Sequence, residues 1–125
     1  LNYVGKMVIE SMWAVSQWAG DFNPFHIHEG QLSGVCYLRV PPSLPDEYAK
    51  EDHYPTVGDI CWFNGQAATF SGHKHQESPK VGDIFLFPNW LAHGVYPFRT
   101  PNEERRSVSF NLHLIKKDEP KPLEN

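Results

Sequence analysis

The sequence lacks the features that mark nucleic-acid-binding and membrane-spanning chains. Its 11 Lys and Arg residues against 15 Asp and Glu give a net charge of −4. No cluster of Lys and Arg is large enough to follow a phosphate backbone. No apolar run reaches the ~18 residues that a membrane-spanning helix needs. We therefore expect neither nucleic acid nor a membrane as a partner, and the composition leaves the oligomeric state open.

Cysteine is also scarce, with only Cys36 and Cys61, each inside an apolar, strand-like run. A disulfide between them and two buried free thiols both fit the sequence. The free thiols are the simpler interpretation, and they predict a cytoplasmic protein. The chain has no signal peptide and begins at Leu1 without an initiator methionine, so we expect a fragment whose N-terminal part is missing.

The residues that are abundant favour short strands over helices. The 125 residues include 14% aromatic residues, 11 prolines and 9 glycines, a mix typical of strands joined by tight turns. Seven or eight such segments predict an all-β sandwich or barrel. It forms one domain over residues 1–115, with a charged tail over 116–125. The strands are expected at 8–18, around the first histidines, and at 33–40, 59–64, 66–70, 84–87, 91–98 and 105–115, with a helical turn at 46–51.

His26 and His28 are the first candidate ligands. In an extended strand, residues i and i+2 point to the same face, so both imidazoles would aim at one point. Imidazole nitrogen is a common ligand for iron, zinc, copper and nickel. A histidine pair hydrogen-bonded across a strand end explains the spacing equally well. A second pair, His73 and His75, has the same spacing but polar neighbours, which indicates a solvated loop.

His93 supplies the third imidazole from a separate segment. It comes five residues after Pro88, which ends the apolar run IFLF. A facial metal site needs a ligand from a second strand, and a lone histidine near a tryptophan is the alternative interpretation. Together with His26 and His28, it favours a metal site.

The last predicted strand alternates cleanly, with Arg105 and Ser107 on its polar face. A guanidinium with a hydroxyl two residues further on forms a cradle for a carboxylate, from two parallel N–H donors and one O–H. On composition alone, a polar face turned to water on an edge strand explains these residues better.

Three separated blocks carry a resemblance over roughly residues 10–114. They are WAVSQWAGDFNPFHIHEGQLSGVCYLRVP, VGDIFLFPNWLAHGVYPF and ERRSVSFNLHL. In this order they resemble a small bacterial and phage family of 2-oxoglutarate/Fe(II)-dependent oxygenases. The resemblance implies a double-stranded β-helix, a jelly-roll of two antiparallel sheets with iron at its open mouth. It also implies dioxygen as a reactant and hydroxylation of a substrate, either a small molecule or a peptidyl side chain.

The same resemblance implies roles for individual residues. His26 would be the first iron ligand and His93 the distal one. Arg105 and Ser107 would hold the far carboxylate of 2-oxoglutarate, with Tyr37 as a further hydrogen-bond donor. The sequence departs from the wider superfamily at the second ligand, where His28 stands in place of a carboxylate. We favour His28 over the adjacent Glu29, because an i+3 side chain points to the other face of a regular strand.

Two other interpretations stay open. A cupin, a metal-binding jelly-roll that does not use 2-oxoglutarate, would explain the three histidines. The chain lacks the glutamate that cupins place after the histidine pair, since Leu32 and Ser33 stand there. A cupin also leaves Arg105 and Ser107 unexplained. The third interpretation is a jelly-roll without catalysis, in which the histidines are inert.

Overall fold

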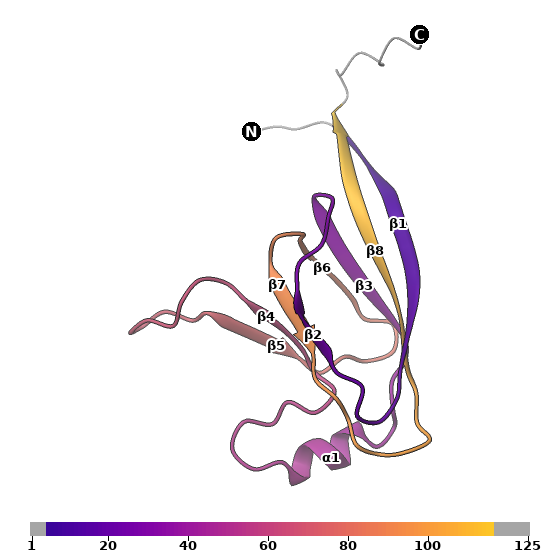
Figure 1. Cartoon of the computed structure of the whole chain (residues 1–125), viewed down its shortest axis with the longest axis vertical. Helices are drawn as coiled ribbons and strands as arrows, with labels where there is room; N and C mark the ends of the chain where they lie inside the picture. The colour runs from indigo at the N-terminus through magenta and orange to yellow at the C-terminus, as the bar shows by residue number, and fades with distance from the viewer. Residues whose placement is uncertain (1–4, 117–125) are drawn as a thin grey trace.

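The computed structural model describes residues 5–116, which form eight strands and one helix (Figure 1). The strands are β1 Gly5–Gln17, β2 Asn23–His26, β3 Leu32–Arg39, β4 Ile60–Phe63, β5 Lys74–Glu77, β6 Ile84–Pro88, β7 Ala92–Val95 and β8 Arg105–Lys116. The helix is α1 Leu44–Lys50. No helix among the described residues is both long and apolar enough to cross a membrane.

The strands form two four-stranded antiparallel sheets. The first has the order β1-β8-β3-β6 and the second the order β2-β7-β4-β5. Consecutive strands thus lie in different sheets at several points, as in a jelly-roll, which confirms the predicted fold class. In Figure 1 the sheets face each other, the β4–β5 hairpin extends away from the first sheet, and α1 lies far from where β1 begins.

The main core lies between the sheets and is largely aromatic. Its buried members are Val35, Tyr37, Ile60, Trp62, Phe87 and Val95. They come from alternate positions of their strands, because every second side chain of a strand points to the same face. A second cluster, Leu44, Val57 and Phe98, fixes α1 beneath the sandwich. Removing apolar side chains from water is the main term that stabilises such a fold.

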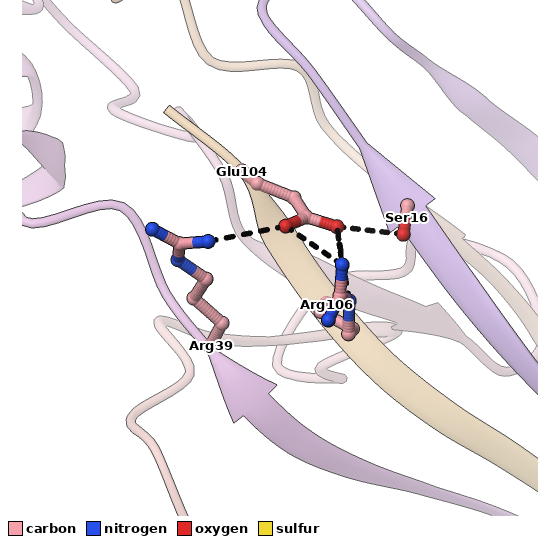
Figure 2. Close-up of polar contacts among 4 residues, drawn as sticks. All are labelled: Ser16, Arg39, Glu104 and Arg106. Atoms are coloured by element: carbon pink, nitrogen blue, oxygen red, sulfur yellow. Dashed lines mark hydrogen bonds and ion pairs between the residues drawn. The ribbon is translucent and has the colours of Figure 1, made fainter. Parts of the chain in front are cut away.

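Polar side chains hold the first sheet together beside the core. Figure 2 shows Glu104, which is 4% exposed, accepting hydrogen bonds from three neighbours. Ser16 of β1 donates at 2.7 Å, Arg39 of β3 at 3.3 Å, and Arg106 of β8 at 3.0 Å. The hydrogen bond from Ser16, supported by both arginines, holds the pKa of Glu104 below its usual range. The Glu104 carboxylate therefore ties three strands together just before Arg105.

Several local expectations were wrong. His75 lies on a strand, β5, and not in a loop; β5 is polar because it is an edge strand with one side in solvent. Residues 66–70 form no strand, apart from one isolated bridge between Ala68 and Ser71. The run IFLF is only half buried, since Ile84 and Leu86 point outward. The helix begins at Leu44, two residues earlier than expected.

The expectations at the cysteines and the C-terminus have different outcomes. Cys36 and Cys61 are both free and lie in different sheets, as the simpler interpretation held, but only Cys61 is buried, and Cys36 is half-buried. Lys116 belongs to β8, and the rest of the proposed tail, residues 117–125, lies outside the described residues.

Candidate metal centre

His26 and His93 lie directly opposite each other on neighbouring strands. β2 ends at His26, and its antiparallel pairing with β7 makes His93 the partner of His26 in the ladder. The centroids of the two rings are 4.4 Å apart. His93 is buried and His26 half-buried. One ladder position thus joins two ligand candidates that are far apart in the sequence.

His28 is positioned by a loop and not by the alternation of a strand, since β2 ends two residues before it. Asn89, in the turn between β6 and β7, holds it on both sides. The backbone N–H of His28 donates to the Asn89 carbonyl at 3.0 Å, and the Asn89 amide donates to the His28 carbonyl at 3.1 Å. Gly30, with a φ of 86°, then turns the chain towards β3. These contacts bring His28 back towards His93.

Hydrogen bonds to carbonyl groups fix the tautomers of two of the three histidines. The Nδ1 atom of His26 lies 2.6 Å from the oxygen of Pro24, and Nδ1 of His93 lies 3.0 Å from that of Leu91. A carbonyl can only accept, so each Nδ1 carries the proton and each Nε2 presents a lone pair. Metal-binding histidines are oriented by the same kind of contact.

The Nε2 atoms of His28 and His93 have the spacing of two ligands on one metal ion. The Nε2 atoms of His28 and His93 are 3.1 Å apart, and one ligand atom from each of the three histidines lies within 4.8 Å of the others. Two imidazoles bound to one ion at about 2.0–2.1 Å, with an octahedral or tetrahedral angle between them, place their nitrogens roughly 2.9–3.4 Å apart. Within residues 5–116, no other group of three potential ligand side chains gathers in this way. Glu29 is exposed and lies outside the group.

Burial keeps the His28 and His93 imidazoles neutral, which is the form that binds metals. It lowers the pKa of His93 to about 4, against the opposing hydrogen bond to Leu91, and the neighbouring histidines lower it further. Burial, with a contribution from His26, also lowers the pKa of His28. The two side chains are therefore unprotonated at neutral pH, so no proton competes with a metal for their lone pairs.

A cavity of about 260 Å³ runs inward from the histidines between the two sheets. Its walls combine apolar core residues with a polar strip. The polar lining residues beyond the histidines are Gln17, Asn23, Tyr37, Ser107 and Ser109. β8 lies between β1 and β3 and is no edge strand, and Ser107 and Ser109 of its polar face line this cavity. A polar ligand can thus be accommodated beside the three histidines.

Arg105 lies behind this polar strip, 1% exposed, and all three guanidinium nitrogens donate to protein oxygens. Nε and Nη2 donate to Gln17 Oε1 at 3.1 and 2.6 Å, and Nη1 donates to the carbonyl of Gly58. Burial lowers the pKa of Arg105, and the nearby Tyr37 and Asp59 oppose this shift. An arginine remains charged at neutral pH, and the buried Asp59 lies close enough to interact with this charge.

Tyr37 and Ser107 lie next to each other across two strands. Tyr37 of β3 is the register partner of Ser107 of β8, and both side chains line the cavity. Burial raises the pKa of Tyr37 to about 12, so its phenol stays protonated and can donate a hydrogen bond. The structure therefore lines one cavity with the predicted histidines, Tyr37 and Ser107. The predicted Arg105 is not part of the lining and lies behind it, at the end that Gln17 closes.

The four tryptophans lie in different surroundings. Trp13 lines the cavity, and its ring lies 5.6 Å from that of His28. Trp62 is a core residue, whereas Trp18 and Trp90 are exposed. Sequence reasoning missed Gln17 and Asn89 altogether. An asparagine directly after the strand-ending Pro88 was the one available signal for Asn89, and nothing local marked Gln17.

Comparison with known families agrees with this geometry. The model of the family described as "Putative 2OG-Fe(II) oxygenase" matches residues 11–111, which include all six predicted site residues. The chain belongs to this 2-oxoglutarate/Fe(II) oxygenase family. A search of curated proteins found no match. Membership implies Fe(II) and 2-oxoglutarate, and it leaves the substrate undefined.

Proposed function

We propose that this protein is a 2-oxoglutarate- and Fe(II)-dependent dioxygenase that hydroxylates a small-molecule or peptidyl substrate. His26, His28 and His93 would hold the iron. Tyr37, Arg105 and Ser107 would hold the far carboxylate of 2-oxoglutarate. A cytoplasmic location stays a prediction from the two free cysteines.

The observation that carries the proposal is the histidine geometry. The Nε2 atoms of His28 and His93 lie at the separation of two ligands on one ion, while carbonyl groups hold the Nδ1 protons of His26 and His93. Fe(II) accepts imidazole nitrogen readily, so the donor set suits the metal. Three neutral imidazoles leave the ion its full double charge, which favours an anionic co-ligand such as the 2-oxo carboxylate end of 2-oxoglutarate.

The protein contributes position and a partly closed cavity. When bound, Fe(II) with 2-oxoglutarate activates dioxygen: one oxygen atom enters the substrate as a hydroxyl, and the other enters succinate, formed with loss of CO₂. Arg105, Tyr37 and Ser107 would hold the inner end of the dicarboxylate, so that its oxo-acid end meets the histidines. The neighbouring core residues keep bulk water from the inner end, where charge-assisted hydrogen bonds are strongest.

The experiment is an anaerobic titration of 2-oxoglutarate into the Fe(II) protein. We expect a weak visible metal-to-ligand charge-transfer band, followed by succinate formation when air is admitted with a suitable substrate. His93→Ala should abolish the band, and Arg105→Ala should weaken the affinity for 2-oxoglutarate by about 100-fold. His53→Ala, at an exposed histidine outside the three-histidine group, is the matched control and should behave as wild type. Absence of the band in the iron-loaded wild type contradicts the proposal.

A cupin-type metal protein is the second candidate, and one observation favours it. The cluster contains three histidines and no carboxylate, whereas the wider oxygenase superfamily uses one. In the same titration this candidate predicts bound metal, no charge-transfer band, and no binding of 2-oxoglutarate that Arg105→Ala could weaken.

A further inference from the structure

Gln17 stands between the cavity and the Arg105 guanidinium. It is the last residue of β1, and the β1–β8 ladder makes it the register partner of Arg105. Its side chain lines the cavity, is 7% exposed, and carries the oxygen that accepts from Arg105. A ligand that enters past the histidines therefore reaches the Gln17 amide before it reaches the guanidinium.

The contact occupies the edge of Arg105 that a carboxylate would use. Nε and Nη2 form the side edge of the guanidinium, and both donate to the one oxygen of Gln17. A carboxylate binds that edge with two parallel hydrogen bonds. Nη1 is held separately by the carbonyl of Gly58. The best carboxylate position on Arg105 is thus taken by a neutral amide oxygen.

The contact with Gln17 reduces the free-energy cost of burying the Arg105 guanidinium. A guanidinium that is 1% exposed and lacks a partner would be strongly destabilising. The Gln17 oxygen satisfies it at the end of the cavity. A charged carboxylate is a stronger acceptor than an amide, so a dicarboxylate can replace the Gln17 oxygen where a neutral ligand cannot.

We propose that Gln17 is a specificity-determining residue that competes with 2-oxoglutarate for Arg105. The inference rests on the proposed function. Its side chain turns away when the far carboxylate binds, and it returns when the cavity empties. Ligands without a second carboxylate leave the Gln17–Arg105 contact in place. The alternative is a fixed support, in which Gln17 only orients Arg105 for the ligand.

The two roles predict opposite changes in affinity. If Gln17 competes, removing its oxygen tightens 2-oxoglutarate binding; if it supports Arg105, removing it weakens binding. Pyruvate carries the same oxo-acid group but no second carboxylate, so its affinity reports only on the metal end. Gln17→Glu places a charged carboxylate against Arg105 and should block the site for 2-oxoglutarate.

The test measures dissociation constants of 2-oxoglutarate and pyruvate for the anaerobic Fe(II) protein by calorimetry. Gln17→Ala should bind 2-oxoglutarate about three- to tenfold more tightly, because the neutral oxygen that competes for Nε and Nη2 of Arg105 is gone. Gln17→Glu should bind it at least roughly tenfold more weakly. Both variants should bind pyruvate as the wild type does. Gln66→Ala, at an exposed glutamine in the β4–β5 loop, is the matched control and should change neither constant.

Gln17→Met, which keeps the side-chain volume without the oxygen, replaces Gln17→Ala if the latter does not fold. Weaker or unchanged 2-oxoglutarate binding in the variant that lacks the oxygen overturns the inference, while the proposed function stands on the binding by wild type. If the wild type binds pyruvate and 2-oxoglutarate with equal affinity, the far carboxylate of 2-oxoglutarate does not contact Arg105. That result overturns the inference and also the assignment of Arg105, Tyr37 and Ser107 to this carboxylate. No binding of 2-oxoglutarate by the iron-loaded wild type overturns both proposals.

Discussion

The two ends of the cavity are prepared for their ligands in different ways. At the histidine end, backbone carbonyls hold the Nδ1 protons of His26 and His93, so their Nε2 atoms carry lone pairs, and that of His93 lies 3.1 Å from Nε2 of His28. At the arginine end, the charged group is already paired, because Gln17 and Gly58 accept all three of its nitrogens. The metal end is ready to bind, whereas the carboxylate end must first exchange a partner.

The difference follows from the cost of burying each group. A neutral imidazole can leave one nitrogen without a partner at modest cost, and the lowered pKa of His93 keeps it neutral. A buried guanidinium remains charged and needs acceptors at all times. The histidines can therefore stay ordered without a ligand at little cost in free energy. At the arginine end, the exchange of the Gln17 oxygen for a carboxylate can select between ligands.

The largest expected effect is on Fe(II) affinity, and it shows whether the histidine end and the arginine end act independently. His93→Ala removes the central imidazole and should weaken Fe(II) binding by about 100-fold or more, with loss of 2-oxoglutarate binding as a consequence. Arg105→Ala should leave the Fe(II) dissociation constant within roughly threefold of wild type, since the guanidinium contacts no histidine. Metal competition with a chromogenic chelator measures both. Equal loss of metal in the two variants would show that the ends are not independent.

The next effect tests how the metal end is held. Asn89→Ala removes the side-chain amide that donates to the carbonyl of His28 and should loosen that ligand. We expect a 10- to 100-fold weaker Fe(II) affinity, the range for supporting contacts around metal ligands. Asn64→Ala, at an exposed asparagine after β4, is the control. An unchanged metal affinity in Asn89→Ala would mean that the backbone alone positions His28.

A smaller effect is expected at the hydroxyl of Ser107. Ser107→Ala removes one donor from the carboxylate end and should weaken 2-oxoglutarate binding by about three- to tenfold, without changing Fe(II) binding. Calorimetry with 2-oxoglutarate and with pyruvate checks the assignment. A matching loss of pyruvate affinity would place Ser107 at the metal end and contradict it.

The smallest effect concerns the carboxylate that supports the arginine end. The pKa of Glu104 is lowered from 4.5, so its ion pairs stabilise the folded chain above that pH, and the contribution is lost as pH falls below it. Glu104→Gln should lower the melting temperature by a few degrees at pH 7, and the difference from wild type should shrink as the pH falls below 4.5. Melting curves across this range measure it. A difference that grows in acid would reverse the assigned sign.

The metal end was predictable because its signals are local. His26 and His28 stand one residue apart, and His93 follows a strand that ends in a proline, so spacing alone indicated three convergent imidazoles. Even so, the reason given for His28 was incomplete. Its position depends on Asn89, which is 61 residues away in the sequence, and a strand period says nothing of such a partner.

The arginine end was only partly predictable because its signals are not local. Alternation in β8 placed Arg105 and Ser107 on one face, but whether that face meets water or a cavity depends on how the second sheet packs against it. Gln17 lies 88 residues from Arg105, and only the pairing of β1 with β8 joins them. The edge strand β5 was not predicted, for a related reason. Its polar residues KHQE are held by pairing with β4 and carry no apolar pattern of their own.

The most direct test of the account is the number of imidazoles on the iron. X-ray absorption spectra of the anaerobic Fe(II) protein should show three imidazole ligands, and His28→Ala should lose the scattering of one of them. A spectrum with two imidazoles and a carboxylate, unchanged in His28→Ala, would contradict the three-histidine centre.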